Sequence, residues 1–125
     1  QRRHGLAEAW LEQFEPFLQR WAGPADAEQV LLHTEIMREH LLVAPPGTGW
    51  RRSGQFDSEP AMRGAREYEF ASIGLFVSGG DAHALRCILR AYGYAEAALD
   101  NTLQNRLMAM ALLQTTTSTP YCSRT

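Results

Sequence analysis

The first part of the chain carries apolar residues at the spacing of a helix. Between residues 5 and 22 they recur at steps of three and four, which places them on one face of a helix. The stripe consists of Leu6, Trp10, Phe14, Phe17 and Trp21. Because aromatic stripes of this kind usually pack into a core, we expect this face to be buried. Pro16 should bend the helix or divide it in two, and Gly23 with Pro24 should end it.

Two short aliphatic runs, at 30–32 and 41–43, predict the next elements, and we expect both to be buried strands. The Pro- and Gly-rich residues 45–49 predict a turn. Apolar residues return after this turn, so residues 41–44 and 50–56 are expected to pair as a β-hairpin. The segment that follows contains Gly64, and we expect it to be a loop.

The second half of the chain predicts three helices. Residues 67–77 are apolar nearly all round, which indicates a buried helix, with a strand as the alternative. Gly79 and Gly80 should end this element, and Asp81 should cap the next helix, which has Leu85, Ile88, Leu89 and Tyr92 on one face. Gly93 should close that helix.

Residues 95–114 are expected to form the last helix, with an apolar stripe that includes Leu99, Leu103 and Leu107. The Thr- and Ser-rich residues 115–125 lack periodicity, and we expect a disordered tail there. The pattern therefore predicts one α+β domain, mainly α, over residues 1–114.

Composition narrows the classes of function. The net charge is −2 and no basic block exists, so nothing predicts a nucleic-acid-binding face. All twelve basic residues are Arg. The absence of Lys excludes a Schiff-base mechanism, and it also excludes the lysine that holds ATP phosphates in kinases.

The cysteines and the hydropathy pattern predict a location in the cell. Cys87 and Cys122 do not make a disulfide framework, and we expect Cys87 to be a small buried hydrophobe. No apolar run is long enough to span a bilayer, and the N-terminal residues do not resemble a signal peptide. We therefore expect a cytoplasmic protein.

The candidate chemistry lies in the polar octet between the two aliphatic runs and shortly after the hairpin. Its titratable residues are His33, Glu35, His40, Asp57 and Glu59. A carboxylate held between strands needs a partner or a role. Glu35 could accept the proton of a hydroxyl group, and His40 with Asp57 could hold a divalent cation. Glu59 could contact a cationic substrate.

The same stretch resembles the C-terminal lobe of the aminoglycoside phosphotransferase family, within the protein-kinase-like superfamily. The family pattern H-x-D-x-x-x-x-N corresponds to residues 33–40, and its acidic metal ligand at the end of a strand corresponds to Phe56-Asp57. The pattern G-x-x-x-Y-[DE]-[FL]-A, which opens a buried helix, corresponds to residues 64–71. The order and the distances agree over residues 28–75.

This resemblance implies a role for each matching residue. Glu35 stands at the position of the catalytic base, and His33 at that of the histidine that anchors the loop. His40 and Asp57 stand at the positions of the magnesium ligands. Glu69 matches the acid that braces the loop from the following helix. The implied cofactors are Mg²⁺ and ATP, and the implied partner is a small-molecule hydroxyl acceptor, antibiotic-like or sugar-like.

The chain also departs from the family pattern. Glu35 replaces an Asp and is one methylene longer, and His40 offers nitrogen where the family has an Asn oxygen. No Gly-rich loop followed by a lysine-bearing strand is present, so the resemblance implies a catalytic lobe without its N-terminal lobe. Alone, such a lobe should bind ATP poorly, and the face that an N-terminal lobe would cover could associate with a partner.

Two other interpretations remain open. His33, Glu35 and a distant His83 could form a 2-His-1-carboxylate iron site, which normally requires a double-sheet jelly roll. Alternatively, the chain could be a non-catalytic remnant or a helical module that packs against a partner.

Overall fold

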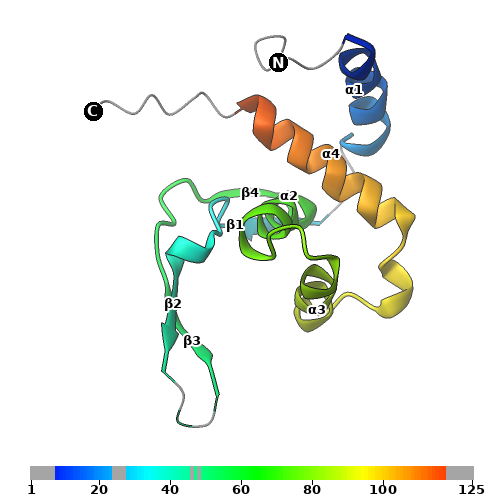
Figure 1. Ribbon diagram of the computed structural model, residues 1–125. Helices are drawn as coiled ribbons and strands as arrows, with labels where there is room; N and C mark the ends of the chain where they lie inside the picture. Colours follow the sequence, from blue (N-terminus) through cyan, green and yellow to red (C-terminus); the bar gives the residue numbers. More distant parts are fainter. Residues whose placement is uncertain (1–7, 24–27, 46, 48, 118–125) are drawn as a thin grey trace.

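The computed structural model describes residues 8–23, 28–45, 47 and 49–117 (Figure 1). In chain order the elements are α1 (Glu8–Trp21), β1 (Gln29–Leu32), the 3₁₀ turn η2 (Arg38–His40), β2 (Leu41–Ala44), β3 (Arg51–Gln55), β4 (Met62–Ala65), α2 (Arg66–Ser72), the π-helical turn η3 (Ile73–Val77), α3 (Ala82–Tyr92), the 3₁₀ turn η4 (Glu96–Ala98) and α4 (Asn101–Thr117). The predicted class, α+β and mainly α, is confirmed.

The helical core forms around α2, which contacts α4 and also β1 and β4. Its buried cluster consists of Phe70, Ile73, Leu89 and Leu103. Residues 66–77 are helical throughout, which confirms the predicted buried helix and excludes the alternative strand. Because α2 touches both the helices and the strands, it links the hydrophobic core to the polar loop after β1.

Two antiparallel strand pairs complete the described part of the fold. β2 and β3 form the predicted hairpin, which projects from the helices with a bulge between Leu42 and Val43 (Figure 1). β1 pairs with β4, where we expected a loop because the segment contains Gly64. The strands are also less buried than predicted: Leu32 is buried, but Leu31 is 79% exposed.

The N-terminal helix differs from the prediction in two ways. α1 runs unbroken through Pro16, so the proline does not divide it. None of its residues is buried, and Trp10 is 61% exposed. The physical reason is that α1 packs mainly against α4, at the edge of the molecule, and one neighbouring helix cannot cover its aromatic face (Figure 1). Leu6 and Pro24 lie outside the described residues.

Caps determine where the last two helices begin. The Asp81 side chain accepts hydrogen bonds from the backbone N–H groups of His83 and Ala84, as predicted. Asp100 accepts from Leu103 N in the same way, so α4 begins at Asn101 and not at residue 95. α4 continues to Thr117, so the first three residues of the expected tail are helical, and residues 118–125 lie outside the described part.

Cys87 is exposed, so the prediction that it is buried was wrong. It lies on the face of α3 opposite Leu89, which is the buried residue of this helix. Its sulfur lies 3.7 Å from His83 Nε2, one turn earlier. None of the helices in the described part of the chain combines the length and the apolar content needed to cross a bilayer.

An aromatic group joins α2 to the end of α3. The Phe70 ring meets Tyr92 and Tyr94 edge-on, with centroids 4.8 and 5.8 Å away. The Arg66 guanidinium lies 4.9 Å from the centre of the Tyr94 ring. Burial raises the pKa of the Tyr94 phenol above its ordinary value of 10.0, and the neighbouring carboxylate of Glu67 raises this pKa further.

The raised pKa predicts how stability changes at alkaline pH. The folded protein holds the phenol proton of Tyr94 more tightly than the unfolded chain does. Its contribution is therefore complete below pH 10.0 and is lost as the pH rises through the higher pKa of the folded state. Tyr94→Phe should flatten this alkaline decline in the free energy of unfolding, measured by denaturant titration at several pH values. Tyr68→Phe is the control and should retain the decline, because Tyr68 is not among the groups that shift the pKa of Tyr94.

Gly64 should not tolerate a side chain, because an added Cβ would lie 2.8 Å from Leu32 Cδ1. Leu32 is 1% exposed, so relief of this contact requires a buried side chain to shift. We expect Gly64→Ala to lower the free energy of unfolding by about 1–3 kcal/mol. Gly47→Ala, where an added Cβ meets nothing within 4 Å, should change it by less than about 0.5 kcal/mol. Equal effects of the two substitutions would contradict the packing argument.

Candidate functional site

The polar loop after β1 is held by one carboxylate from α2. Glu69 accepts a hydrogen bond from His33 N at 2.6 Å with one oxygen and from Thr34 N at 3.0 Å with the other. Thr34 has a left-handed backbone with φ of 71°, which is rare and unfavourable for a β-branched residue. Its hydroxyl donates to Pro60 O at 3.2 Å. The predicted role of Glu69 as a brace thus has a direct structural basis.

His33 ties the loop to the segment that carries Asp57. Its Nε2 lies 3.1 Å from the backbone oxygen of Phe56. Because a carbonyl oxygen can only accept, Nε2 carries the proton and donates it. The geometry agrees with an anchoring histidine, and His33 is absent from the group of side chains that could bind a metal.

His40 contacts the backbone of Glu35 and the side chain of Asp57. Its Nδ1 lies 2.6 Å from the backbone oxygen of Glu35, so Nδ1 carries a proton. Its Nε2 then faces Asp57 Oδ2 at 3.4 Å. In a neutral imidazole this nitrogen has a lone pair, and two acceptors would face each other. A second proton on the ring, or a cation between the two atoms, removes this conflict.

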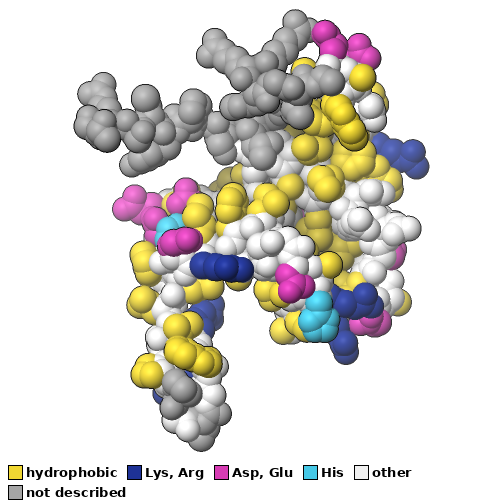
Figure 2. Space-filling view, in the orientation of Figure 1, with side chains coloured by type: hydrophobic (Ala, Val, Ile, Leu, Met, Phe, Trp, Pro, Cys, Tyr) yellow, Lys and Arg dark blue, Asp and Glu magenta, His cyan; other side chains and the backbone are white. Residues whose placement is uncertain are grey.

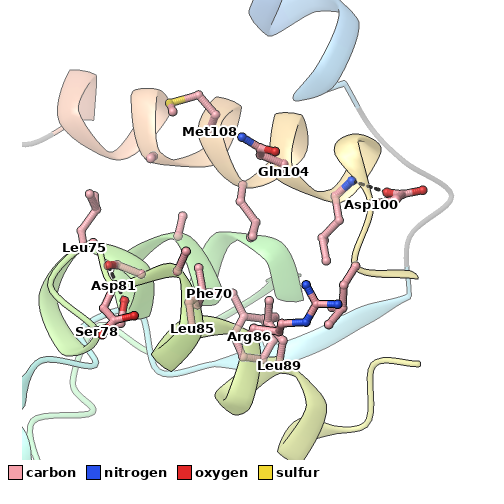
Figure 3. A pocket seen from close by; sticks show the side chains of 18 residues that line it. Phe70, Leu75, Ser78, Asp81, Leu85, Arg86, Leu89, Asp100, Gln104 and Met108 are labelled. Atoms are coloured by element: carbon pink, nitrogen blue, oxygen red, sulfur yellow. Dashed lines mark hydrogen bonds between the residues drawn. The ribbon is translucent and has the colours of Figure 1, made fainter. Parts of the chain in front are cut away.

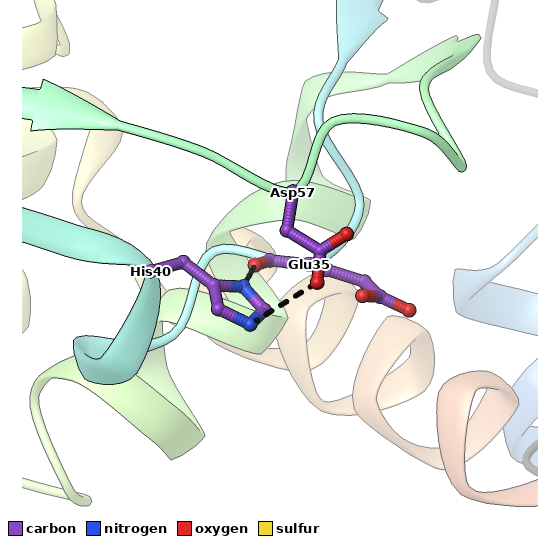
Figure 4. A group of neighbouring side chains, drawn as sticks. All are labelled: Glu35, His40 and Asp57. Carbon is purple, nitrogen blue, oxygen red and sulfur yellow. Dashed lines mark hydrogen bonds and ion pairs between the residues drawn. The ribbon is translucent and has the colours of Figure 1, made fainter.

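Glu35, His40 and Asp57 converge, as Figure 4 shows. One potential ligand atom from each lies within 4.8 Å of the others, and no second such group occurs among the described residues. Asp57 has a left-handed backbone with φ of 65°, which directs its side chain from the end of β3 back toward the loop. The three residues that the sequence suggested for the base and the metal ligands therefore share one site.

The donor set fits a hard divalent cation. An octahedral cation with ligands at about 2.1 Å holds neighbouring ligand atoms about 3 Å apart, close to the 3.4 Å between His40 and Asp57. Two carboxylates supply the oxygen that Mg²⁺ prefers, and the imidazole nitrogen suits Mn²⁺ as well. Asp57 is exposed and His40 is half-buried, so a phosphate-bearing ligand could reach the site.

Other predicted residues lie apart from this group. Glu59 is exposed and outside it, and His83 lies at the start of α3, beside Cys87. The described structure thus does not assemble the iron site suggested for His33, Glu35 and His83, and it has no jelly roll. Glu67 is 8% exposed and pairs with Arg106 at 3.6 Å.

Sequence reasoning missed a contact that fixes the far end of the loop. Arg38 Nε donates to the backbone oxygen of Val77, at 2.7 Å, near the end of η3. Gly79 has φ of 63°, and an added Cβ there would lie 3.2 Å from the Arg38 guanidinium. The pair of glycines after residue 77 was a visible signal of a tight turn, but nothing in the sequence connects that turn to Arg38.

The surface separates charged and apolar regions. Figure 2 shows Asp, Glu and His side chains gathered where the hairpin joins the helices, and hydrophobic side chains along the hairpin itself. Its exposed large hydrophobic residues include Leu42, Val43 and Trp50.

A cavity of about 450 Å³ lies between η3, α3 and α4 (Figure 3). Its walls are mainly apolar and contain none of Glu35, His40 or Asp57. Its two acids, Asp81 and Asp100, are the helix caps described above. This cavity therefore shares no residue with the group that could bind a cation.

Comparison with known proteins identifies the family of the chain. The model of the phosphotransferase enzyme family (APH) matches residues 1–101. The chain therefore belongs to this family, whose general activity is phosphoryl transfer. Neither the search of curated proteins nor the search of solved structures found a significant match.

The brace predicts a large effect on stability. Glu69→Ala leaves two backbone N–H groups without their acceptor, which we expect to lower the free energy of unfolding by about 2–4 kcal/mol. Glu69→Gln keeps one acceptor oxygen and should cost less. Glu39→Ala, an exposed acid on η2, is the matched control and should change stability by less than about 0.5 kcal/mol. Chemical denaturation measures all three, and a neutral Glu69→Ala would contradict the role of the brace.

Proposed function

We propose that this chain is the catalytic lobe of a small-molecule phosphotransferase that moves the γ-phosphate of ATP to a hydroxyl group. One observation carries the proposal: Glu35, His40 and Asp57 converge in a chain of the phosphotransferase family. The loop that presents Glu35 is held at one end by Glu69 and at the other by Arg38. Catalysis by proximity and orientation requires that the catalytic group be held rigidly in this way.

Glu35 is the proposed base. Its carboxylate orients the acceptor hydroxyl and receives its proton as the new bond to phosphorus forms. Its backbone oxygen is fixed by His40 Nδ1, so the residue is anchored at its main chain while its side chain reaches out. The extra methylene relative to Asp gives the carboxylate a longer reach from this anchored backbone.

Asp57 and His40 are the proposed holders of Mg²⁺ or Mn²⁺. A bound cation would neutralise negative charge on the β- and γ-phosphates. Asp57 contributes a carboxylate oxygen and His40 contributes Nε2, whose lone pair faces Asp57. His33 keeps Asp57 in place by holding the oxygen of the preceding residue.

The nucleotide-binding part is proposed to be a separate lobe. These 125 residues contain no Lys, so the lysine that pairs with ATP phosphates in kinases must come from elsewhere. The exposed apolar side chains of the hairpin, Leu42, Val43 and Trp50, are the proposed contact surface for that lobe. Because ATP is the phosphate donor, we place the protein in the cytoplasm.

The cation site can be tested without ATP. We expect the chain to bind Mn²⁺, measured by the relaxation rate of water protons, and Asp57→Asn to weaken this binding at least about tenfold because a charged ligand is lost. Asn accepts the left-handed backbone at this position, so the fold should remain intact. Glu59→Gln, which removes an exposed acid two residues away, should leave the affinity unchanged.

Two results would contradict the proposal. Unchanged Mn²⁺ affinity in Asp57→Asn would remove Asp57 from the site. A wild-type chain that binds no Mn²⁺ but forms dimers as its concentration rises would favour a non-catalytic interaction module. The native mass of the protein in its source tests the separate lobe, since added sequence with a lysine-bearing strand should raise the mass above 14.0 kDa.

A further inference from the structure

A second cavity, of about 390 Å³, lies directly beside Glu35. It is formed by the loop after β1, the segment that leads into β4, and α2 with η3 and α4. Its volume is in the range of small-molecule sites. Because Glu35 belongs both to this cavity and to the cation group, a hydroxyl bound in the cavity would lie next to the proposed base and near the transferred phosphate.

The walls of this cavity are largely apolar. Ile36, Met37, Met62, Tyr68 and Phe76 line it. Phe76 is 50% exposed and Met62 is 45% exposed, so large hydrophobic surfaces face solvent at its mouth. Apolar surface of this kind beside a titratable group is typical of a ligand site, and Met side chains adapt to ligands of irregular shape.

The cavity offers little charge to a ligand. Glu35 is its one carboxylate, and its other polar residues are neutral. The hydroxyl of Thr34 is already used by Pro60 O. Glu67, which could have attracted a cation, is turned toward Arg106, and Glu59 is not part of the lining. A polycationic amine would leave most of its charges unpaired against apolar walls, which is costly.

We infer that the acceptor is an uncharged, largely apolar alcohol that binds in this cavity with its hydroxyl toward Glu35. The inference rests on the proposed function for the reaction itself, and it adds the class of substrate. Phe76 and Met62 determine specificity by covering the apolar body of the acceptor. A polyamine sugar would need several carboxylates in the cavity walls, and this cavity has one.

The four methionines of the chain allow a direct test. Met37 and Met62 line this cavity, Met108 lines the cavity of Figure 3, and Met110 is buried in the core. With isotope-labelled methionine methyl groups, decahydronaphthol, a saturated fused-ring alcohol, should shift the NMR signals of Met37 and Met62 and leave Met110 unchanged. Neamine, a small polyamine sugar, should shift neither at the same concentration.

A matched pair of variants locates the binding. Phe76→Ser should weaken decahydronaphthol binding roughly tenfold, because a large apolar contact is lost. Leu75→Ser changes the neighbouring residue, which is equally exposed but lines the other cavity, and should leave the affinity unchanged. Circular dichroism checks that both variants fold, and Mn²⁺ binding should persist in both.

Three results would overturn the inference. The first is tighter binding of neamine than of decahydronaphthol at Met37 and Met62. The second is that decahydronaphthol shifts the signal of Met108 and not those of Met37 and Met62. The third is that decahydronaphthol shifts none of the methionine signals. If Mn²⁺ binding with its dependence on Asp57 persists in these cases, the proposed phosphotransferase function stands and only the class of acceptor is wrong. If Mn²⁺ binding fails while the alcohol binds, the cavity is a ligand site without the proposed chemistry.

Discussion

The position of the polar loop depends on the carboxylate of Glu69. This side chain comes from α2, which packs against α4, and both of its oxygens accept backbone N–H groups of the loop. It thereby stabilises the left-handed backbone of Thr34, which would otherwise cost about 1–3 kcal/mol. Glu35 follows Thr34 directly in the chain, and a carboxylate oxygen of Glu35 lies within 4.8 Å of potential ligand atoms of His40 and Asp57. The hydrophobic core is thus connected to the polar site through one side chain, Glu69.

The sequence predicted the local features of the fold better than the extent of burial. The cap at Asp81 and the pairing of β2 with β3 follow from residues close together in the chain, and both were found. β4 was missed because its pairing with β1 joins residues that are 30 to 36 positions apart in the chain. The exposure of Trp10 and Cys87 was also missed, since a stripe of apolar residues does not say how much surface its neighbours can cover.

Sequence reasoning could suggest those residues of the candidate site that occur at characteristic spacings in the chain. Glu35, His40 and Asp57 were suggested by their positions relative to the strands, and the structure brings their side chains together. The ion pair between Glu67 and Arg106 could not be predicted, because Arg106 lies on α4, far along the chain. The apolar cavity beside Glu35 could not be predicted, since its walls come from four separate segments with no common pattern.

The left-handed backbone of Asp57 has an evolutionary consequence. Among L-residues, Asn and Asp adopt this conformation most readily, and Gly does so without strain. Of the substitutions possible at position 57, Asn and Gly are therefore the ones that the backbone conformation tolerates best. Neither residue has a carboxylate. A single substitution at Asp57 can therefore remove the carboxylate while the backbone keeps its conformation. Descendants that keep the fold but lack this carboxylate lie one mutation away.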